Sequence, residues 1–162
     1  MPEVETIRRA EQDKREGKAP STQAGEFVRE EIHHIREGKH GATSTKQAIA
    51  IGLSKARRAG VKLPASKSAS KATKAQAKRD TAKATKRTKP SATRSRAMRK
   101  ALRDEGHSAA SPSALAKHAR ASARKHTAAE RSAAAKKAVR TKGPAARSAA
   151  AKKAARTRAR NR

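Results

Sequence analysis

The sequence contains no cysteine, tryptophan or tyrosine, and Phe27 is its single aromatic residue. Without cysteine, the chain can form neither a disulfide framework nor a thiolate metal site. No stretch approaches the roughly 20 apolar residues of a membrane span. Residues 1–16 also lack the apolar segment of a secretory signal. These absences predict a soluble, cytoplasmic protein that has no membrane partner.

Acidic residues are scarce, with 13 Asp and Glu against 43 Lys and Arg, which gives a formal net charge of +30 in 162 residues. The imbalance lies in residues 65–162, which hold 30 Lys and Arg against four acids; residues 1–64 hold 13 against nine. A segment with this charge needs a polyanion, and the abundant cellular polyanions are DNA and RNA.

Large apolar residues are almost absent from the same basic tail, where they are Met98, Leu102, Leu115 and Val139. Burying such a side chain gains roughly 1.5–3 kcal/mol, whereas ordering one residue costs about 1–2 kcal/mol. The free energy gained by burying four side chains is therefore far smaller than the entropic cost of ordering 98 residues. We therefore expect an all-α protein in which a small N-terminal helical hairpin precedes a long tail that is largely disordered or conditionally helical.

Residues 1–20 are charged and mixed in sign, and we interpret them as a solvated leader in which Val4 and Ile7 could mark a short helix. Gly17 and Pro20 would then break that helix.

Residues 21–64 carry the helical hairpin. Val28, Ile32 and Ile35 recur at helical spacing from about residue 26, and Gly38 is a natural stop. Ser44 and Gln47 form a capping-box pattern, so a second helix should begin near Thr45. That helix, with Ile49, Leu53 and Ala56 on one face, should end near Ala59 with a Gly60–Val61 Schellman ending.

The basic tail divides into three parts by composition. Residues 65–93 are low-complexity Lys, Ala, Ser and Thr, which predicts a flexible linker. Residues 94–127 suggest two weak helices, the second opened by Ser111–Pro112. Residues 128–162 contain a 16-residue repeat, RSAAAKKAVRTKGPAA followed by RSAAAKKAARTRARNR, with Gly143–Pro144 as a hinge between the copies. We expect these copies to become helical when phosphate neutralises them, because like charges oppose the free helix.

Catalysis and metal binding have little support in the sequence. There is no cysteine and no glycine-rich phosphate loop. His33 and His34 point about 100° apart on a helix, and no cysteine or ordered carboxylate spacing completes a metal site with them and His40. We expect no enzyme activity, no cofactor, no metal and no small-molecule substrate.

The candidate nucleic-acid-binding side chains are cations of the second helix and the tail. They are Lys46, Lys55, Arg57, Arg58, Lys86, Arg87, Arg94, Arg96, Arg99, Lys100, Arg120, Arg124, Lys125, Arg131, Lys136, Lys137, Arg140, Arg147, Lys152, Lys153, Arg156, Arg158 and Arg160. Each phosphate contact releases counterions and makes affinity fall with salt. A flexible tail cannot hold donors rigidly at base edges, so we expect little sequence preference. The lack of aromatics disfavours single strands and RNA loops, and so favours duplex DNA over RNA.

Two resemblances agree with this interpretation. Residues 46–60, KQAIAIGLSKARRAG, resemble the hallmark motif of a small bacterial family of uncharacterised basic proteins, and the likeness extends over residues 21–64. That family implies a bacterial source and no particular activity. The tail, with AAAKKA and the step Lys89–Pro90, is similar in composition to the Lys/Ala-rich tails of linker histones and bacterial histone-like proteins.

We therefore predict a nucleoid-associated, histone-like protein that neutralises phosphate and compacts DNA without reading its sequence. An RNA- or ribosome-associated protein is one alternative, because the same charge serves both polymers. Another is an adaptor whose hairpin docks a protein partner. The hairpin itself could self-associate, contact DNA generally, or act as a helix-turn-helix reader through residues such as Lys46 and Gln47.

Overall fold

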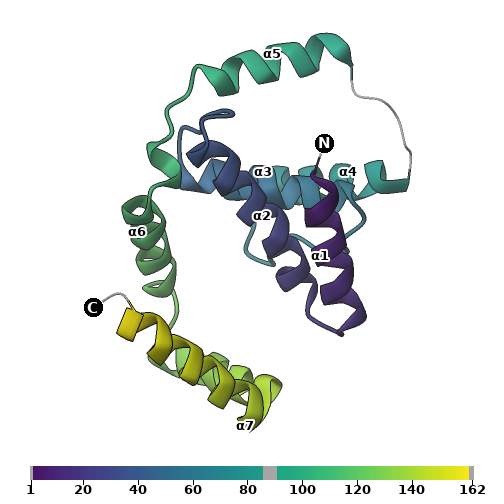
Figure 1. Ribbon diagram of the computed structural model, residues 1–162. Helices are drawn as coiled ribbons and strands as arrows, with labels where there is room; N and C mark the ends of the chain where they lie inside the picture. Colours follow the sequence, from purple (N-terminus) through teal and green to yellow (C-terminus); the bar gives the residue numbers. More distant parts are fainter. Residues whose placement is uncertain (1, 86–90, 161–162) are drawn as a thin grey trace. The chain divides into compact units, whose positions relative to one another are not determined.

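The computed structural model describes residues 2–85 and 91–160 of the chain, and the described part contains helices and no strand (Figure 1). Contacts divide the chain into two compact units, residues 1–118 and 119–162. The elements are α1 (Val4–Arg15), α2 (Pro20–Arg36), α3 (Thr45–Arg58), α4 (Lys71–Thr85), α5 (Ala92–Arg103), the 3₁₀ turn η1 (Ser108–Ala110), α6 (Pro112–Ala123) and α7 (Ala128–Arg160). The all-α class is thereby confirmed.

The expectation of a long, largely disordered tail is wrong for the residues that the structure describes. α4, α5, α6 and α7 are helices. Alanine is the strongest helix former, and lysine and arginine follow closely. Local backbone propensity can therefore form these helices even though most of their side chains bury nothing.

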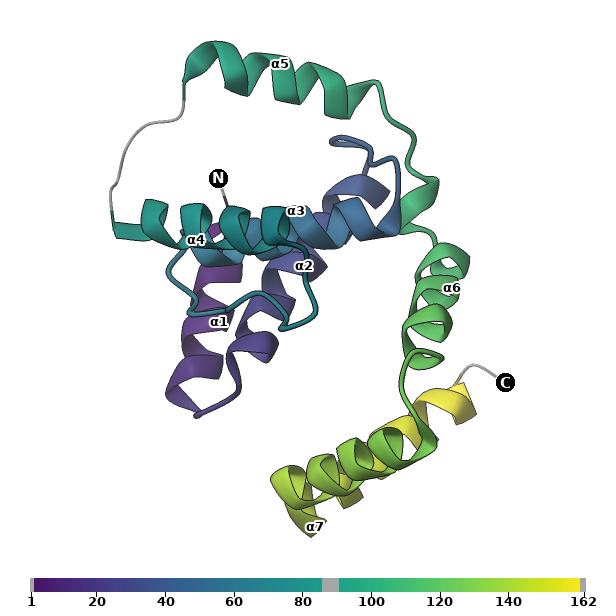
Figure 2. The ribbon, with the colours of Figure 1, turned by 180° about the vertical axis from the view of Figure 1, so that it is seen from behind.

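Residues 1–20 also differ from the expected solvated leader, because α1 packs against α2 (Figures 1 and 2). α1 buries three small or short side chains at helical spacing, Thr6, Ala10 and Asp13. Gly17 ends the helix at φ 69°, as expected. Pro20 does not break the chain there but occupies the first turn of α2, where its missing N–H is not needed.

α2 begins at Pro20, well before the expected start near residue 26, whereas α3 follows the sequence pattern closely at both ends. The Ser44 hydroxyl accepts a hydrogen bond from the Gln47 N–H at 3.2 Å, and the Gln47 side chain accepts one from the Thr43 N–H at 2.7 Å. At the other end of α3, the Val61 N–H donates to the Ala56 carbonyl at 3.0 Å and Gly60 adopts φ 97°. The predicted Ser44 cap and the Schellman ending are therefore confirmed, whereas the return bond of the capping box comes from the Thr43 N–H in place of the Ser44 N–H.

The face that α3 turns toward α2 is made of small residues. Thr45, Ala48, Gly52 and Ala56 are buried, whereas Ile49 and Leu53 are only partly buried. A Cβ placed on Gly52 would lie 2.6 Å from the Cα of Val28. The two backbones approach closely at this point because Gly52 has no side chain.

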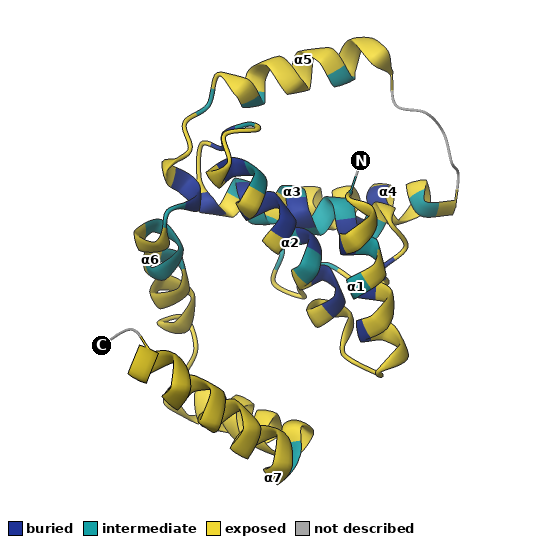
Figure 3. Cartoon of the chain, viewed as in Figure 1, coloured by how far each residue is buried: buried dark blue, intermediate teal, exposed yellow. Residues whose placement is uncertain are grey.

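Two apolar clusters form the core of the N-terminal unit, and their buried residues lie mainly along α2 and α3 (Figure 3). One cluster joins Phe27 of α2 to Ala10, Ala24, Ala56 and Val61. The other joins Ile32, Ile35, Ala42 and Ala48 to Ala109 and Ala110 of η1, with Leu115 of α6 packed against it. Both clusters depend on residues outside the predicted hairpin.

α4 occupies the first part of the segment that we expected to be a flexible linker, and it packs on α3. Its fully buried Asp80 accepts hydrogen bonds from the Ser54 hydroxyl at 2.8 Å and from the Arg58 Nε at 2.9 Å. One acidic residue thus fixes a helix that otherwise buries only Ala77.

α7 is interrupted at Gly143, which has φ 67° and ψ 170° and precedes Pro144. After this point the chain turns back along the first half of the helix (Figures 1 and 2). The predicted break between the two repeat copies is therefore present in the structure.

Candidate nucleic-acid interface

The acidic residues of the N-terminal segment are all neutralised within the fold. Each of the nine acids in residues 1–64 lies within 4.0 Å of a basic or histidine side chain. The pairing is visible in the pKa values: hydrogen bonds from Lys18 lower the pKa of Glu16, and those to Asp13 and Glu16 raise the pKa of Lys18. This part of the chain therefore has little free charge for a polyanion.

Three of the four α3 cations predicted to contact DNA have partners inside the N-terminal unit. The Lys55 Nζ lies 2.5 Å from the Glu31 Oε2, and Arg58 lies 2.9 Å from Asp80. The Arg57 Nε donates to the Leu63 carbonyl at 2.9 Å. Lys46 is exposed near the start of α3. The structure therefore does not assemble a basic face on α3 from these residues.

Three of the four acids of the tail have structural contacts, and none of the four forms an ion pair with a lysine or arginine of the tail among the described residues. Asp80 holds α4, and Glu105 accepts a hydrogen bond from Gln47 at 3.3 Å. Glu130 caps α7, because its Oε2 accepts from the Thr127 N–H at 2.7 Å and this bond lowers its pKa. Asp104 occupies the C-cap position of α5 and its side chain is exposed.

As a result, the tail cations lack carboxylate partners. Among described residues, the ion pairs that involve any residue after 64 are Arg58–Asp80 and His126–Glu130. Neither pair includes a lysine or arginine of the tail itself. Charged side chains that form ion pairs are therefore concentrated in residues 1–64, whereas the described lysines and arginines after residue 64 have no carboxylate partner.

α5 presents its cations on one face. Arg96, Arg99, Lys100 and Arg103 follow the i, i+3, i+4, i+7 spacing of a single helix face and are exposed. With Asp104 they line a hollow of about 540 Å³. Arg94 is exposed at the start of the same helix.

α5 is joined to the loop between α2 and α3 through backbone contacts at its C-terminal end. The Gly41 N–H donates to the Leu102 carbonyl at 2.6 Å, and the Ala42 N–H donates to the Gly106 carbonyl at 3.0 Å. A Cβ on Gly41 would lie 1.8 Å from the Glu105 carbonyl oxygen, so glycine is required at this approach.

The remaining predicted cations lie in and after α6 and in α7, and all of them are exposed (Figure 3). These are Arg120, Arg124, Lys125, Arg131, Lys136, Lys137, Arg140, Arg147, Lys152, Lys153, Arg156, Arg158 and Arg160. Arg131 donates to the His126 carbonyl at 2.6 Å and so also secures the start of α7. Lys86 and Arg87 lie outside the described residues.

Sequence reasoning missed a buried polar cluster in the N-terminal unit. The side chains of Glu30 and Glu31 are 2% and 1% exposed, and Lys55 lies between them. His34 and His40 are close by, with ring centroids 6.2 Å apart. The divergence of His33 and His34 was correctly expected, since His33 pairs with Glu37 at the surface. What the pattern did not reveal is that the loop after Gly38 returns His40 to the His34 side of α2.

Comparison with known proteins supports the resemblance of residues 21–64 to a family of uncharacterised proteins. No helix in the described part of the chain has the length and apolar character needed to cross a membrane. Neither the curated proteins nor the solved structures contain a match to the chain. A family of unknown function, DUF6496, matches residues 13–67, which run from the end of α1 through α3 and include the motif of residues 46–60.

Proposed function

We propose that this protein binds nucleic acid without sequence specificity, in the manner of a histone-like nucleoid protein, with duplex DNA as its favoured partner. The observation that carries this proposal is the separation of charge. The N-terminal acids are paired within the fold, whereas the described lysines and arginines of residues 65–160 have no carboxylate partner.

The arrangement of the free cations supports phosphate contact over base recognition. They are long, exposed side chains on helices that bury little, so nothing fixes their donors against a base edge. Each contact with phosphate releases counterions, and affinity should therefore fall steeply with salt.

The two repeat copies of α7 support a compacting role. Lys136, Lys137 and Arg140 recur as Lys152, Lys153 and Arg156 on the far side of the break at Gly143. Two equivalent basic segments joined at a glycine can neutralise phosphates on neighbouring stretches of one polymer. The likeness of this tail to linker-histone tails is consistent with the same role.

A salt-dependent competition titration tests the proposal with the whole chain, freed of nucleic acid, against duplex DNA, single-stranded DNA and structured RNA. We expect duplex DNA to bind most tightly. A preference for RNA would replace the DNA assignment with an RNA-associated one. Affinity that is insensitive to salt would contradict phosphate binding altogether.

A matched pair of variants separates free cations from net charge. In one, Arg147, Lys152, Lys153 and Arg156 become glutamine; in the other, Arg8, Lys14, Arg15 and Arg29 do. Both lose four charges, but three of the second four are ion-paired. The slope of log K against log salt should fall by up to about 3.6 in the first variant, at about 0.9 per contact. It should change much less in the second, and equal losses would contradict the proposed interface.

A further inference from the structure

Three potential metal ligands converge at the end of α2 and in the loop after it. They are Glu31, His34 and His40, and one ligand atom from each lies within 4.8 Å of those of the other two. The Glu31 side chain is 1% exposed, and those of His34 and His40 are 13% and 17% exposed. A carboxylate and two imidazoles in a sheltered position are a common ligand set for zinc.

The hydrogen bonding of His40 leaves one ring nitrogen free for a metal. Its Nδ1 lies 3.0 Å from the Gly41 carbonyl oxygen. A carbonyl oxygen can only accept, so Nδ1 carries the proton and the lone pair of the neutral ring is on Nε2. That Nε2 lies 3.2 Å from the Oε1 of Glu31, which is also an acceptor.

The contact between these two acceptors has no hydrogen bond to explain it. Glu31 Oε1 is buried and has no hydrogen-bond donor among the described residues. Two lone pairs at this separation repel each other, so the pair needs a positive charge between the two atoms, supplied either by a proton on Nε2 or by a metal ion. Zinc bonds of about 2.0–2.2 Å at a tetrahedral angle place neighbouring ligand atoms about 3.3–3.6 Å apart, and the spacing of this pair lies just below the lower end of that range.

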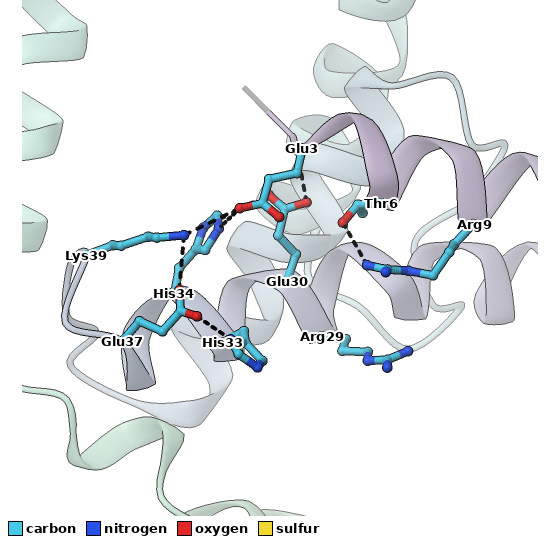
Figure 4. A pocket seen from close by; sticks show the side chains of 9 residues that line it. All are labelled: Glu3, Thr6, Arg9, Arg29, Glu30, His33, His34, Glu37 and Lys39. Atoms are coloured by element: carbon cyan, nitrogen blue, oxygen red, sulfur yellow. Dashed lines mark hydrogen bonds and ion pairs between the residues drawn. The ribbon is translucent and has the colours of Figure 1, made fainter.

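His34 is held in the corresponding way by an acidic residue of the N-terminal segment. Its Nε2 lies 2.8 Å from the Oε1 of Glu3, and Figure 4 shows this bond beside the Lys39 ammonium on the same carboxylate. An ionised carboxylate accepts, so the proton is on Nε2 and the lone pair is on Nδ1. Histidines that bind metals characteristically donate their other N–H to a carboxylate or a backbone carbonyl.

We propose that Glu31, His34 and His40 bind a divalent transition-metal ion, zinc in the first instance, through Glu31 Oε1, His34 Nδ1 and His40 Nε2. Water would take the fourth position. This site goes beyond nucleic-acid binding, and its three ligands lie within the part of the chain that the family of unknown function matches.

The charges around the site are compatible with one bound cation. Glu30 and Glu31 are both buried. Among the described residues, Lys55 is the single lysine or arginine that forms an ion pair with either of them. Lys55 approaches the Oε2 of Glu31 and so leaves Oε1 for the metal. Its positive charge lowers the affinity, and the second carboxylate, Glu30 Oε1 at 4.0 Å from His34 Nδ1, offsets it.

Zinc titration of the chelator-stripped full chain by calorimetry tests the proposal, with cobalt absorption as a spectroscopic readout. We expect one zinc per chain and a cobalt spectrum typical of tetrahedral nitrogen and oxygen ligands. His40→Gln should weaken binding by at least tenfold. His33→Gln is the matched control and should leave it within twofold, because His33 is 67% exposed and bonded to Glu37.

A second variant tests the positioning role of Glu3. Glu3→Gln keeps all three ligands and should weaken zinc binding about tenfold, the size of effect usual for a partner of a metal-bound histidine. Far-UV circular dichroism of the apo variants checks that each remains helical. Absence of stoichiometric zinc binding overturns the site, as does equal weakening by His33→Gln and His40→Gln.

Discussion

The Nζ of Lys55 lies 2.5 Å from the Oε2 of Glu31 and 3.7 Å from the Oε1 of Glu30, and it joins the last turn of α3 to two buried carboxylates of α2. Removing one partner of a buried ion pair leaves an uncompensated charge, which is far more costly than losing a surface pair. Lys55 thus contributes to the fold, a role that its sequence position did not indicate.

Replacing Lys55 with methionine should lower the free energy of unfolding. We expect a loss of about 3 kcal/mol, the lower end for breaking a buried pair, because Lys55 is 24% exposed. Urea denaturation in the presence of a chelator measures it. Lys46→Met, an exposed position on the same helix, should change stability by less than about 0.5 kcal/mol; similar losses in both variants would contradict the structural role of Lys55.

Gly52→Ala should destabilise the protein, although the same change in a helix usually stabilises it by about 1 kcal/mol. The new Cβ would lie 2.6 Å from the Val28 Cα, a backbone atom that cannot move aside alone. We expect a loss of about 1–3 kcal/mol from this overpacking.

Gly25→Ala is the natural control, because it is also inside a helix and its Cβ would meet nothing within 4 Å. That substitution should raise the thermal midpoint slightly while Gly52→Ala lowers it. If both raise the midpoint, the close approach of α2 and α3 at Gly52 is incorrect.

The features that could be predicted from sequence are those that a few neighbouring residues determine. Ser44 with Gln47, Gly60 with Val61, and the break at Gly143 each depend on local backbone chemistry and appear where expected. Ser111–Pro112 likewise begins α6, with the Ser111 hydroxyl accepting from the Ala114 N–H at 3.2 Å.

The features that could not be predicted depend on how separate helices meet. Apolar periodicity favoured Ile49 and Leu53 as the core face of α3, yet Ala48 and Gly52 make the close contact with α2. Likewise, Asp80 is one acid in a lysine-rich stretch, and only the position of α3 beside it explains why α4 packs there.

The metal-ligand cluster had one usable local signal, the i, i+3 spacing of Glu31 and His34, which places both side chains on neighbouring positions of one helix face. His40 lies beyond a turn, and its return depends on Gly38 at φ 74° and on the path of the loop through Gly41. The path of this loop cannot be predicted from the spacing of residues along the sequence.

The contact between Glu3 and His34 should make the docking of α1 sensitive to acid. The His34 hydrogen bond and then the Lys39 hydrogen bond lower the pKa of Glu3 below its ordinary value of 4.5. A carboxyl with a lowered folded pKa contributes stability above its unfolded pKa and loses it as the pH falls through the folded value. This contribution should therefore be complete at neutral pH and disappear below about pH 4.5.

Carbon-detected NMR titration of the Glu3 carboxyl in the chelated protein measures this directly. We expect a midpoint below 4.5 that moves back toward 4.5 in Lys39→Gln, because one of the two hydrogen bonds is lost. A wild-type midpoint at or above 4.5 would contradict the contact.

Asp80→Asn should release α4 while leaving the α2–α3 hairpin folded. Asp80 accepts hydrogen bonds from Ser54, Arg58 and Gln76, and its burial is complete. The asparagine amide has the same volume but lacks the negative charge that pairs with Arg58. It also replaces one acceptor oxygen with an NH₂ group, which would face the donor groups that now bond to Asp80. Hydrogen exchange should therefore speed up in residues 71–85, with little change in residues 24–35.

Asp104→Asn is the control, because Asp104 is exposed and has no ion pair among the described residues. Unchanged exchange in α4 would show that Ala77 and the helix backbone suffice to hold it, whereas loss of protection in both α4 and α2 would make Asp80 a requirement for the whole N-terminal unit.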